Sequence, residues 1–306
     1  MTTERTRQLA RVRQRRQRER NRAGVRRHQV RDLQLEETTT RYAPLERPAI
    51  TLNIPGPKHG LKIAVLPDVQ VRSGVPIAHL SAYGQYLAEK RPDVIVCIGD
   101  FADMPSLSGY NAPGSLEMEG LRYKNDVRAV RAAMSAFLAP IRAIKGYNPV
   151  KILTYGNHED RILRTVASTP RQLEGLMTLD DLGYEAAGWK TYPFLQPVIV
   201  GGIAFCHYFP SGVLGRPVTS AKELLRKMHM SCFAGHLQGR DIAFSKRADG
   251  TSMTAIISGS YYLHDETYLS PFTNKHWRGA YVLHEVKDGS YDEMALSIGY
   301  LMRRFS

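Results

Sequence analysis

Apolar stretches recur through the first half of the chain, and polar side chains follow each of them. Residues 61–66, 93–98 and 150–155 have the continuous apolar character of strands that are buried on both faces. Between the first two, Ile77 to Arg91 has apolar residues at helical spacing and stops before Pro92. A strand–helix–strand order predicts parallel pairing with a right-handed crossover. The first half therefore predicts a βαβαβ unit, with a second helix over about residues 118–144.

The second half is dominated by short strand-like runs. They cover residues 196–200, 202–207, 231–235, 241–245 and 251–258, and one helix near residues 219–230 interrupts them. Glycine-containing turns at residues 248–250 and 287–290 favour hairpins, because glycine accepts the positive φ that such turns need. We expect this half to be mostly antiparallel. The predicted fold class is α/β (α+β), with two packed mixed β-sheets flanked by helices.

Polar residues end five of the predicted strands. The densest group follows the third strand and reads Gly-Asn-His-Glu-Asp from Gly156 to Asp160. Taken alone, this stretch is open to a capping interpretation, in which Asn157 caps a helix that begins at His158. Loops at the carboxyl ends of strands are, however, where α/β proteins carry their chemistry. The full set is Asp68 with Gln70, Asp100, Asn157 with His158, His207, and His236 with Gln238.

The recurrence of this pattern favours a metal site. Burying unpaired carboxylates and imidazoles costs several kcal/mol each. Five strand ends that all finish in oxygen or nitrogen ligands are therefore hard to explain by packing. A pair of divalent cations is the simplest explanation.

The order of these blocks resembles the calcineurin-like metallophosphoesterase superfamily. This chain reads Asp-x-Gln, Gly-Asp, Gly-Asn-His-Glu, His and Gly-His-x-Gln, and the family has histidine where Gln70 and Gln238 stand. The resemblance spans residues 62–238 and extends through the closing strands to about residue 303. It implies two packed mixed sheets with flanking helices and a metallophosphoesterase activity. A much weaker likeness points to phage or prophage members of the superfamily.

The resemblance also implies a role for each matching residue. Asp100 would bridge two metal ions, and His158 would be the catalytic residue that faces the leaving-group oxygen. Two such ions can share a hydroxide, lower its pKa and clamp the phosphoryl oxygens for in-line attack. Glu159 is left with a structural role. One ion would be held by Asp68, Gln70 and Gln238 together with Asp100, and the other by Asn157, His207 and His236.

The two glutamines fall on the same metal site. A glutamine offers a neutral carbonyl oxygen, which is a harder and weaker ligand than imidazole. This favours Mn²⁺, with Mg²⁺, Fe²⁺ and Zn²⁺ as alternatives, and predicts weak occupancy of the site that contains Gln70 and Gln238. Catalysis with a single metal ion is an open alternative.

The expected reaction is hydrolysis of a phosphomonoester or phosphodiester by metal-activated hydroxide. Arg161, Arg240, His264 and Lys275 are predicted to contact the anionic substrate, and ordinary loop residues with satisfied hydrogen bonds are the alternative for them. One competing hypothesis is a DNA or RNA nuclease of the same superfamily. Another is a catalytically inactive nucleic-acid-binding or assembly protein.

Positive charge is concentrated at the N-terminus. The 306 residues carry a formal net charge of +13. Residues 1–31 hold twelve arginines against Glu4 and Glu19, a net charge of +10, which leaves +3 for the remaining 275 residues. We predict a helical or disordered arm over residues 1–41, a Pro-rich linker over 42–60 and a metallophosphoesterase domain over 61–306. Residues 1–31 are predicted to contact nucleic-acid phosphates, and a solvated tail is the alternative.

The cysteines and the hydropathy pattern predict the cellular compartment of the protein. Cys97, Cys206 and Cys232 all lie in apolar strand-like runs, and an odd count without a C-x-x-C pair argues against a disulfide frame. We expect small, reduced core residues. No apolar run reaches the length of a membrane span, and the N-terminus has no apolar signal region. The expectation is a cytoplasmic protein without membrane contact.

Overall fold

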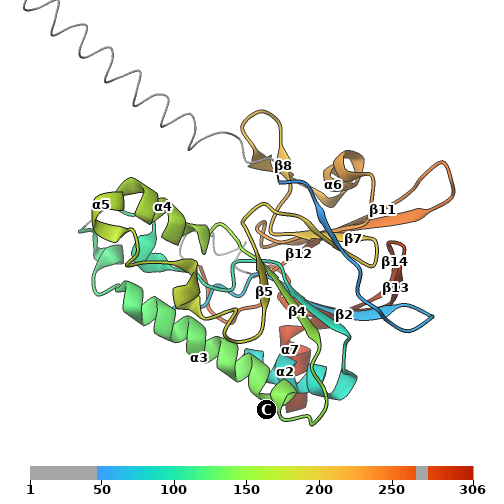
Figure 1. The fold of residues 1–306 in the computed structure, drawn as a ribbon, viewed down its shortest axis with the longest axis horizontal. Coiled ribbons are helices and arrows are strands. Elements are labelled where there is room, and N and C mark those ends of the chain that lie inside the picture. Colours follow the sequence, from blue (N-terminus) through green and yellow to red (C-terminus); the bar gives the residue numbers. More distant parts are fainter. Residues whose placement is uncertain (1–46, 113, 267–274, 306) are drawn as a thin grey trace, which may run out of the picture. The chain divides into compact units, whose positions relative to one another are not determined.

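Two six-stranded β-sheets form the centre of the computed structural model, which describes residues 47–112, 114–266 and 275–305 (Figure 1). The first sheet has the order β14-β13-β2-β3-β4-β5 and the second the order β1-β6-β7-β10-β12-β11. The strands of the first sheet are β2 (Leu61–Leu66), β3 (Val94–Cys97), β4 (Val150–Thr154), β5 (Lys190–Tyr192), β13 (Gly279–Lys287) and β14 (Ser290–Ser297). Those of the second are β1 (Ile50–Leu52), β6 (Val198–Val200), β7 (Ile203–Cys206), β10 (Cys232–Ala234), β11 (Arg240–Lys246) and β12 (Ser252–Ser258).

The core between the sheets follows from the two-residue period of the strands. In β2, Ile63 and Val65 face the second sheet and belong to one buried cluster with Ile203 and Phe205 of β7. The alternate residues of the same strands point outward into other clusters. Because both faces of the central strands are covered, their sequences are apolar at nearly every position.

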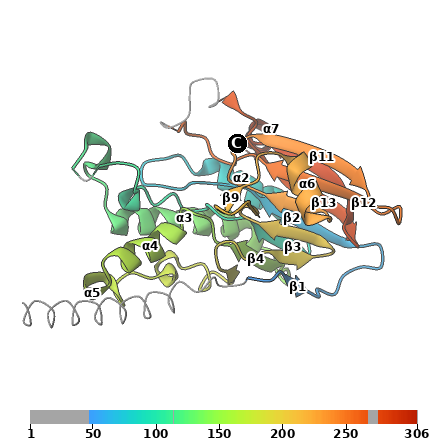
Figure 2. The same cartoon turned by 90° about the horizontal axis from the view of Figure 1, so that it is seen from above.

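Helices cover the outer face of each sheet (Figures 1 and 2). On the first sheet, α2 (Ala78–Lys90), α3 (Tyr123–Arg142) and α7 (Ile298–Phe305) pack in one cluster through residues such as Tyr83, Phe137 and Leu301. On the second sheet, α6 (Ala221–Met228) packs through Leu224 and Leu225. The smaller elements are η1 (Pro105–Leu107), η2 (Leu116–Met118), α4 (Asp160–Ser168), α5 (Pro170–Leu173), η3 (Leu179–Leu182), β8 (Pro210–Ser211) and β9 (Arg216–Pro217).

The predicted fold class is confirmed, but the pairing expected in the second half is partly wrong. Strands β7, β10 and β12 are parallel neighbours, and so are β1 and β6. The sequence suggested hairpins because two turns each contain a glycine, and those turns do join the antiparallel pairs β11–β12 and β13–β14. The helix α6 lies between β7 and β10 in the chain, and its crossover makes these two strands parallel.

Some predictions fall at the edge of the described residues. The arm predicted over residues 1–41 lies outside them. Within the range 42–60, residues 50–52 form β1 at the edge of the second sheet. The three cysteines are free and buried, as expected of core residues. In the described part of the chain, no helix is both long enough and apolar enough for a bilayer crossing.

His79 makes the stability of this fold sensitive to acid. Its ring lies in α2, is almost fully buried beside Tyr261, and has no hydrogen-bond partner at either ring nitrogen among the described residues. Burial lowers the pKa of His79 from 6.5 to about 4. Between these values the unfolded chain binds a proton at His79 and the folded chain does not, so this group makes the free energy of unfolding fall as pH falls from 6.5 toward 4.

We expect His79→Leu to remove part of the pH dependence of stability. Between pH 7.5 and pH 5 the contribution of His79 to the loss of stability is about 2 kcal/mol, from the linkage of pKa to folding. Urea denaturation of the wild type and the variant at both pH values measures it. His59→Leu is the matched control, because His59 is exposed. An equal loss of stability on acidification in the wild type and His79→Leu would contradict this role of His79.

Candidate metal centre

The polar residues that follow the strands meet at one edge of the two sheets. Strands β2, β3 and β4 are parallel neighbours, so the chain leaves all three at the same edge. The segments that follow carry Asp68, Asp100 and Asn157. In the second sheet, β7 and β10 are parallel neighbours and are followed by His207 and His236. The parallel order thus brings together side chains that lie up to 168 positions apart, as in the hydrogen bond from His236 N to Asp68.

Four of these residues form a compact cluster. Asp100, His207 and His236 each offer one ligand atom, and these atoms all lie within 4.8 Å of one another. The Oδ1 atom of Asn157 lies 2.9 Å from Nε2 of His207 and 2.8 Å from Nδ1 of His236. Oδ2 of Asp100 lies 3.3 Å from Nε2 of His207. This is the group that the sequence assigned to one ion, together with the predicted bridging carboxylate.

The residues assigned to the other ion lie next to this cluster. Oδ2 of Asp68 accepts hydrogen bonds from the backbone N–H of His236 at 2.9 Å and from Nε2 of Gln238 at 3.1 Å. Gln70 is buried, and its backbone N–H donates to the carbonyl of Asp100 at 2.8 Å. Oδ1 of Asp68 and Oε1 of Gln238 are buried and have no hydrogen-bond partner among the described residues. Two buried oxygens without a hydrogen bond are costly unless something positive meets them. For Oδ1 of Asp68, the nearby positive group in the structure is Nδ1 of His207, at 4.0 Å.

The backbone around the cluster is constrained in two ways. Gln70, Asp100, His236 and Gln238 all have positive φ, between 48° and 68°, which is uncommon for residues other than glycine and collects at functional sites. The neighbouring glycines are needed for space. A Cβ atom on Gly156 would come within 2.0 Å of Oδ1 of Asp100, and the corresponding approach to Asp68 at Gly235 is 2.2 Å.

Burial and neighbouring charges shift the pKa values of the groups in the cluster. Burial, only partly offset by His207, raises the pKa of Asp68 to about 7, and the charge of Asp100 adds to the rise. Burial would lower the pKa of His207, but Asp100 and Asp68 outweigh it and raise that pKa to about 9. Burial lowers the pKa of His236 to about 4, which keeps its ring neutral. Burial would raise the pKa of Asp100 as well, but His158 and His207 outweigh it and hold that pKa below its usual range. The raised pKa of His207 shows that the two carboxylates favour a positive charge beside them.

The donor set fits divalent metal ions. It combines carboxylate and amide oxygens with two imidazoles, a mixture that first-row divalent cations accept. Asp68 and Gln238 each have a buried oxygen without a hydrogen bond, and both oxygens could serve as further ligand atoms. Asn157, which the sequence alone also allowed as a helix cap, does not cap α4: the residue at that position is Glu159, and it makes no capping hydrogen bond through its side chain.

His158 stands beside the cluster and is held by Asp103. Nδ1 of His158 lies 2.8 Å from Oδ1 of Asp103 and 3.0 Å from its carbonyl oxygen, and Nε2 lies 3.7 Å from Oδ2 of Asp100. Burial would lower the pKa of His158, but the charge of Asp100 and the hydrogen bond to Asp103 raise it above its ordinary value. The ring is therefore fixed with Nε2 toward the cluster, and its environment favours the protonated form.

Sequence reasoning did not identify Asp103 or the residues behind it. Arg72 donates to Oδ2 of Asp103 at 2.8 Å and contacts both carboxylate oxygens of Glu266 at 2.9 Å. Glu266 in turn lies 2.6 Å from Nε2 of His264. Asp103 falls three residues after Asp100 in a loop without periodicity, so its spacing was the only available signal. Arg72 and Glu266 are 194 positions apart, and only the fold brings them together.

Glu159 has the structural role that the sequence expected. Its carboxylate is fully buried and accepts hydrogen bonds from the backbone N–H groups of Asp100, Ala102 and Gly156 at 2.9–3.0 Å and from the hydroxyl of Tyr184 at 3.2 Å. These bonds tie the loop after β3 to the loop after β4. Glu159 therefore fixes the distance between Asp100 and the segment that carries Asn157 and His158.

The four residues predicted to contact substrate differ in their burial and in the groups that they contact. Arg161 is buried, and its guanidinium donates to the carbonyl of Asp103 at 2.8 Å and lies 3.4 Å from Nε2 of His158. Arg240 pairs with Glu293 at 2.6 Å and lies over the ring of Trp277. His264 contacts Glu266, as described above, and Lys275 is exposed. Of the four, Arg161 is the one whose contacts reach His158, and substrate contact by any of them stays a prediction.

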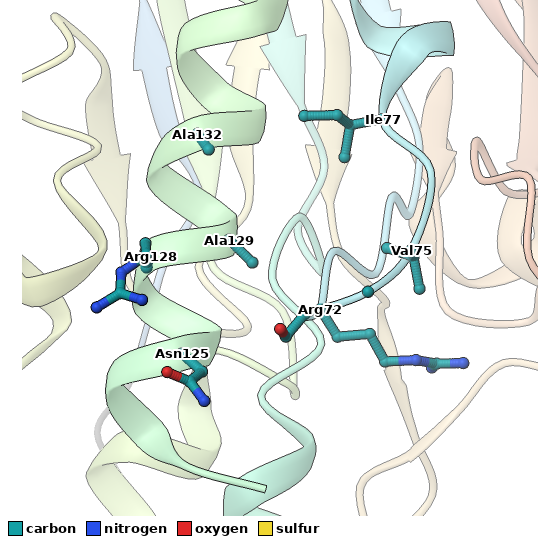
Figure 3. A pocket seen from close by; sticks show the side chains of 9 residues that line it. Arg72, Val75, Ile77, Asn125, Arg128, Ala129 and Ala132 are labelled. Atoms are coloured by element: carbon teal, nitrogen blue, oxygen red, sulfur yellow. The ribbon is translucent and has the colours of Figure 1, made fainter.

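One cavity among the described residues lies away from the metal cluster. It has a volume of about 360 Å³ and lies between α3 and the segment 72–77 that leads into α2 (Figure 3). Asn125, Arg128 and Ala129 line it from the helix, and the side chain of Arg72 runs from its edge away from α3. The guanidinium of Arg72 is thus directed toward Asp103 and Glu266 and not into the cavity.

Comparison with known proteins gives weak structural similarities. No protein-family model and no curated protein matches the chain. A metallophosphoesterase structure from Sphaerobacter thermophilus is 14% identical with a TM-score of 0.37, over 80% of this chain and 93% of that one. A structure from Thermus thermophilus is 8% identical with a TM-score of 0.31, over 77% and 99%. A conserved protein from Streptococcus pneumoniae, described as a predicted phosphoesterase, is 12% identical with a TM-score of 0.27, over 77% and 97%. These similarities carry no functional argument, and any function has to be inferred from the residues of this chain.

Proposed function

We propose that this chain is a metal-dependent phosphoesterase of the calcineurin-like superfamily that hydrolyses a phosphomonoester or phosphodiester. The observation that carries the proposal is the convergence of Asp68, Asp100, Asn157, His207 and His236 from five strand ends on one buried edge of the sheets. The catalytic candidate His158 lies at the same edge, within 3.7 Å of Asp100.

The same residues define how the metal ions would be held. Asp100, Asn157, His207 and His236 would hold one ion, and Asp68, Gln70 and Gln238, together with Asp100, the other. When bound, such ions supply a nucleophilic hydroxide at neutral pH and stabilise negative charge on the phosphoryl oxygens. Mn²⁺ is favoured, because the two glutamines provide oxygen where imidazole would favour zinc.

His158 would act on the leaving-group oxygen of the ester. Asp103 accepts from Nδ1 and so directs Nε2 toward the cluster. The raised pKa of His158, in which the charge of Asp100 and the hydrogen bond to Asp103 outweigh the effect of burial, keeps a proton available at Nε2. That proton can pass to the departing alkoxide oxygen or hydrogen-bond a phosphoryl oxygen. Arg161, whose guanidinium lies 3.4 Å from Nε2, places a second positive charge beside the same position, and this charge by itself lowers the pKa of His158.

The test is turnover of small phosphoesters with and without divalent metal. The proposal predicts hydrolysis of phosphomonoesters or phosphodiesters that requires Mn²⁺ or a related ion and stops after chelation. Absence of metal-dependent turnover on any mono-, di- or cyclic ester would leave the inactive binding or assembly protein as the better interpretation.

A nuclease is the second candidate, and the charge of residues 1–31 favours it. A segment with a net charge of +10 can hold a nucleic acid through its phosphates, with a strong dependence on salt. We expect deletion of residues 1–40 to reduce hydrolysis of single- or double-stranded DNA at least tenfold at about 100 mM salt, from the loss of phosphate contacts. Hydrolysis of a small aryl phosphodiester is expected to stay unchanged. Equal activity of both forms on DNA would exclude this use of the segment.

A further inference from the structure

We propose that Tyr208, backed by Phe194, is a stacking surface for an aromatic ring carried by the substrate. This inference deepens the proposed function and rests on it, because it assigns the substrate class of the same site. The ligand chemistry is a phosphoester whose organic group contains a planar aromatic ring, either a nucleobase or a simple aryl group.

Tyr208 is placed against two of the predicted metal ligands. It directly follows His207, and its ring centroid lies 6.0 Å from that of His207 and 4.9 Å from that of His236. His236 contacts Asn157 through Nδ1 at 2.8 Å. The tyrosine ring is therefore separated from the cluster by a single imidazole.

Phe194 fixes the orientation of this ring. The Phe194 and Tyr208 centroids are 5.4 Å apart at an interplanar angle of 80°, an edge-to-face arrangement, and Phe194 also lies 6.2 Å from His207. The next residue, Leu195, has φ of 63°, which is unusual for a bulky side chain. The segment after β5 thus adopts a strained backbone where it presents Phe194 to Tyr208 and His207.

Both rings are only partly buried, and so is the ring of His236 that Tyr208 lies against. Tyr208 and Phe194 are intermediate in exposure, whereas His207 is fully buried. The next element on this side is α4, where the Arg164 guanidinium is 60% exposed and donates to the carbonyl of Asn157 at 2.7 Å. The ring of Tyr208 and the guanidinium of Arg164, which is paired with Asp160 at 3.2 Å, thus lie beside the cluster with part of their surface exposed.

The competing explanation is that Tyr208 only packs against His236 and holds it in place. The two roles predict different effects of a Tyr208 substitution on aromatic and alkyl esters. A packing role affects every ester equally, because it acts on the metal ligand. A stacking role acts on aromatic esters selectively, and the loss of one base–aromatic stack weakens binding by roughly tenfold or more.

The test compares aromatic and alkyl esters in the full chain with added Mn²⁺. Substrates of matched phosphate type are adenosine 5′-monophosphate, phenyl phosphate and glycerol phosphate, or the corresponding diesters. For Tyr208→Leu we expect kcat/KM to fall at least about tenfold more on an aromatic ester than on the alkyl ester, mainly through KM. Tyr208→Phe should keep the wild-type preference, because it keeps the ring. Phe194→Leu serves as the second variant and should shift the preference in the same direction. Tyr110→Leu, at a residue 90% exposed, is the matched control.

A binding measurement separates this inference from the proposed function. Saturation-transfer NMR with adenosine, and separately with phenol, reports ring contact without turnover. Transfer that is present in the wild type and lost in Tyr208→Leu supports the stacking surface even if no ester is hydrolysed. An equal effect of Tyr208→Leu on aromatic and alkyl esters, or transfer that does not depend on Tyr208, would overturn it. A signal from adenosine alone assigns the nucleotide class, and an equal signal from phenol assigns the broader aryl class.

Discussion

Replacing Asp100 with asparagine is expected to abolish phosphoester hydrolysis while leaving the fold intact. Asparagine keeps the oxygen that accepts the backbone N–H of His158 at 2.9 Å, and it tolerates the left-handed backbone at this position, where φ is 49°. What it removes is the negative charge beside His207 and His158. Changes to residues that only support metal ligands cost roughly 10–100-fold, so the loss of a bridging ligand should exceed about 100-fold in kcat/KM.

A matched control for this variant is Asp288→Asn. Asp288 is exposed in the turn between β13 and β14 and has φ of 52°, so the same chemical change is made on the same kind of backbone away from the cluster. Activity of each variant is measured with saturating Mn²⁺, and thermal unfolding confirms that both are folded. Wild-type activity in a folded Asp100→Asn protein would contradict the assignment of Asp100.

Replacing His158 with glutamine is expected to slow hydrolysis by a factor that depends on the leaving group of the ester. If Nε2 protonates the departing oxygen, an alkyl ester needs it and a p-nitrophenyl ester, whose leaving group is stable as an anion, needs it far less. General acid catalysis contributes roughly 10²–10⁴-fold. We expect a loss of about 100-fold or more on an alkyl ester and less than about tenfold on the p-nitrophenyl ester.

Two further variants sharpen this prediction. Asp103→Asn removes the anion that orients Nδ1 of His158 but keeps the imidazole. The fall in hydrolysis rate should therefore be smaller than in His158→Gln, and it should again be larger for the alkyl ester than for the p-nitrophenyl ester. His229→Gln is the matched control, because His229 is exposed at the end of α6. A loss in His158→Gln that is equal for both esters would show that His158 binds phosphate and does not supply the proton.

The architecture could be predicted from hydropathy because strands buried on both faces leave an unmistakable pattern. Residues 61–66 and 150–155 needed no other signal, and the structure places β2 and β4 there. The pairing of the second half could not be predicted in the same way. Strand direction depends on what connects the strands, and the short runs around α6 do not show whether that helix crosses over or merely interrupts a meander.

The convergence of the candidate ligands on one sheet edge could be predicted because each of them follows a strand within four residues. Asp100 and His207 are examples: each follows a buried run within three residues, so the sequence carries their position at the sheet edge. The network behind His158 could not be predicted, because Asp103 and Arg72 lie in loops and Glu266 lies far away in the chain. Their contacts are long-range, and no local period encodes them. The sequence does not single out Tyr208 either, because its contact with His236 is also long-range.

The most direct test of the central claim is to measure bound metal and phosphate release in the same samples of wild type and Asp100→Asn. We predict that wild type binds divalent metal, with Mn²⁺ giving the highest turnover, and that chelation removes metal and activity together. Asp100→Asn should bind less metal and release phosphate more than about 100-fold more slowly, since it loses a ligand and not merely a supporting residue. Wild-type protein that binds no divalent metal, or that hydrolyses phosphoesters equally well after chelation, would contradict the claim that the strand-end cluster is a metal centre for phosphoester hydrolysis.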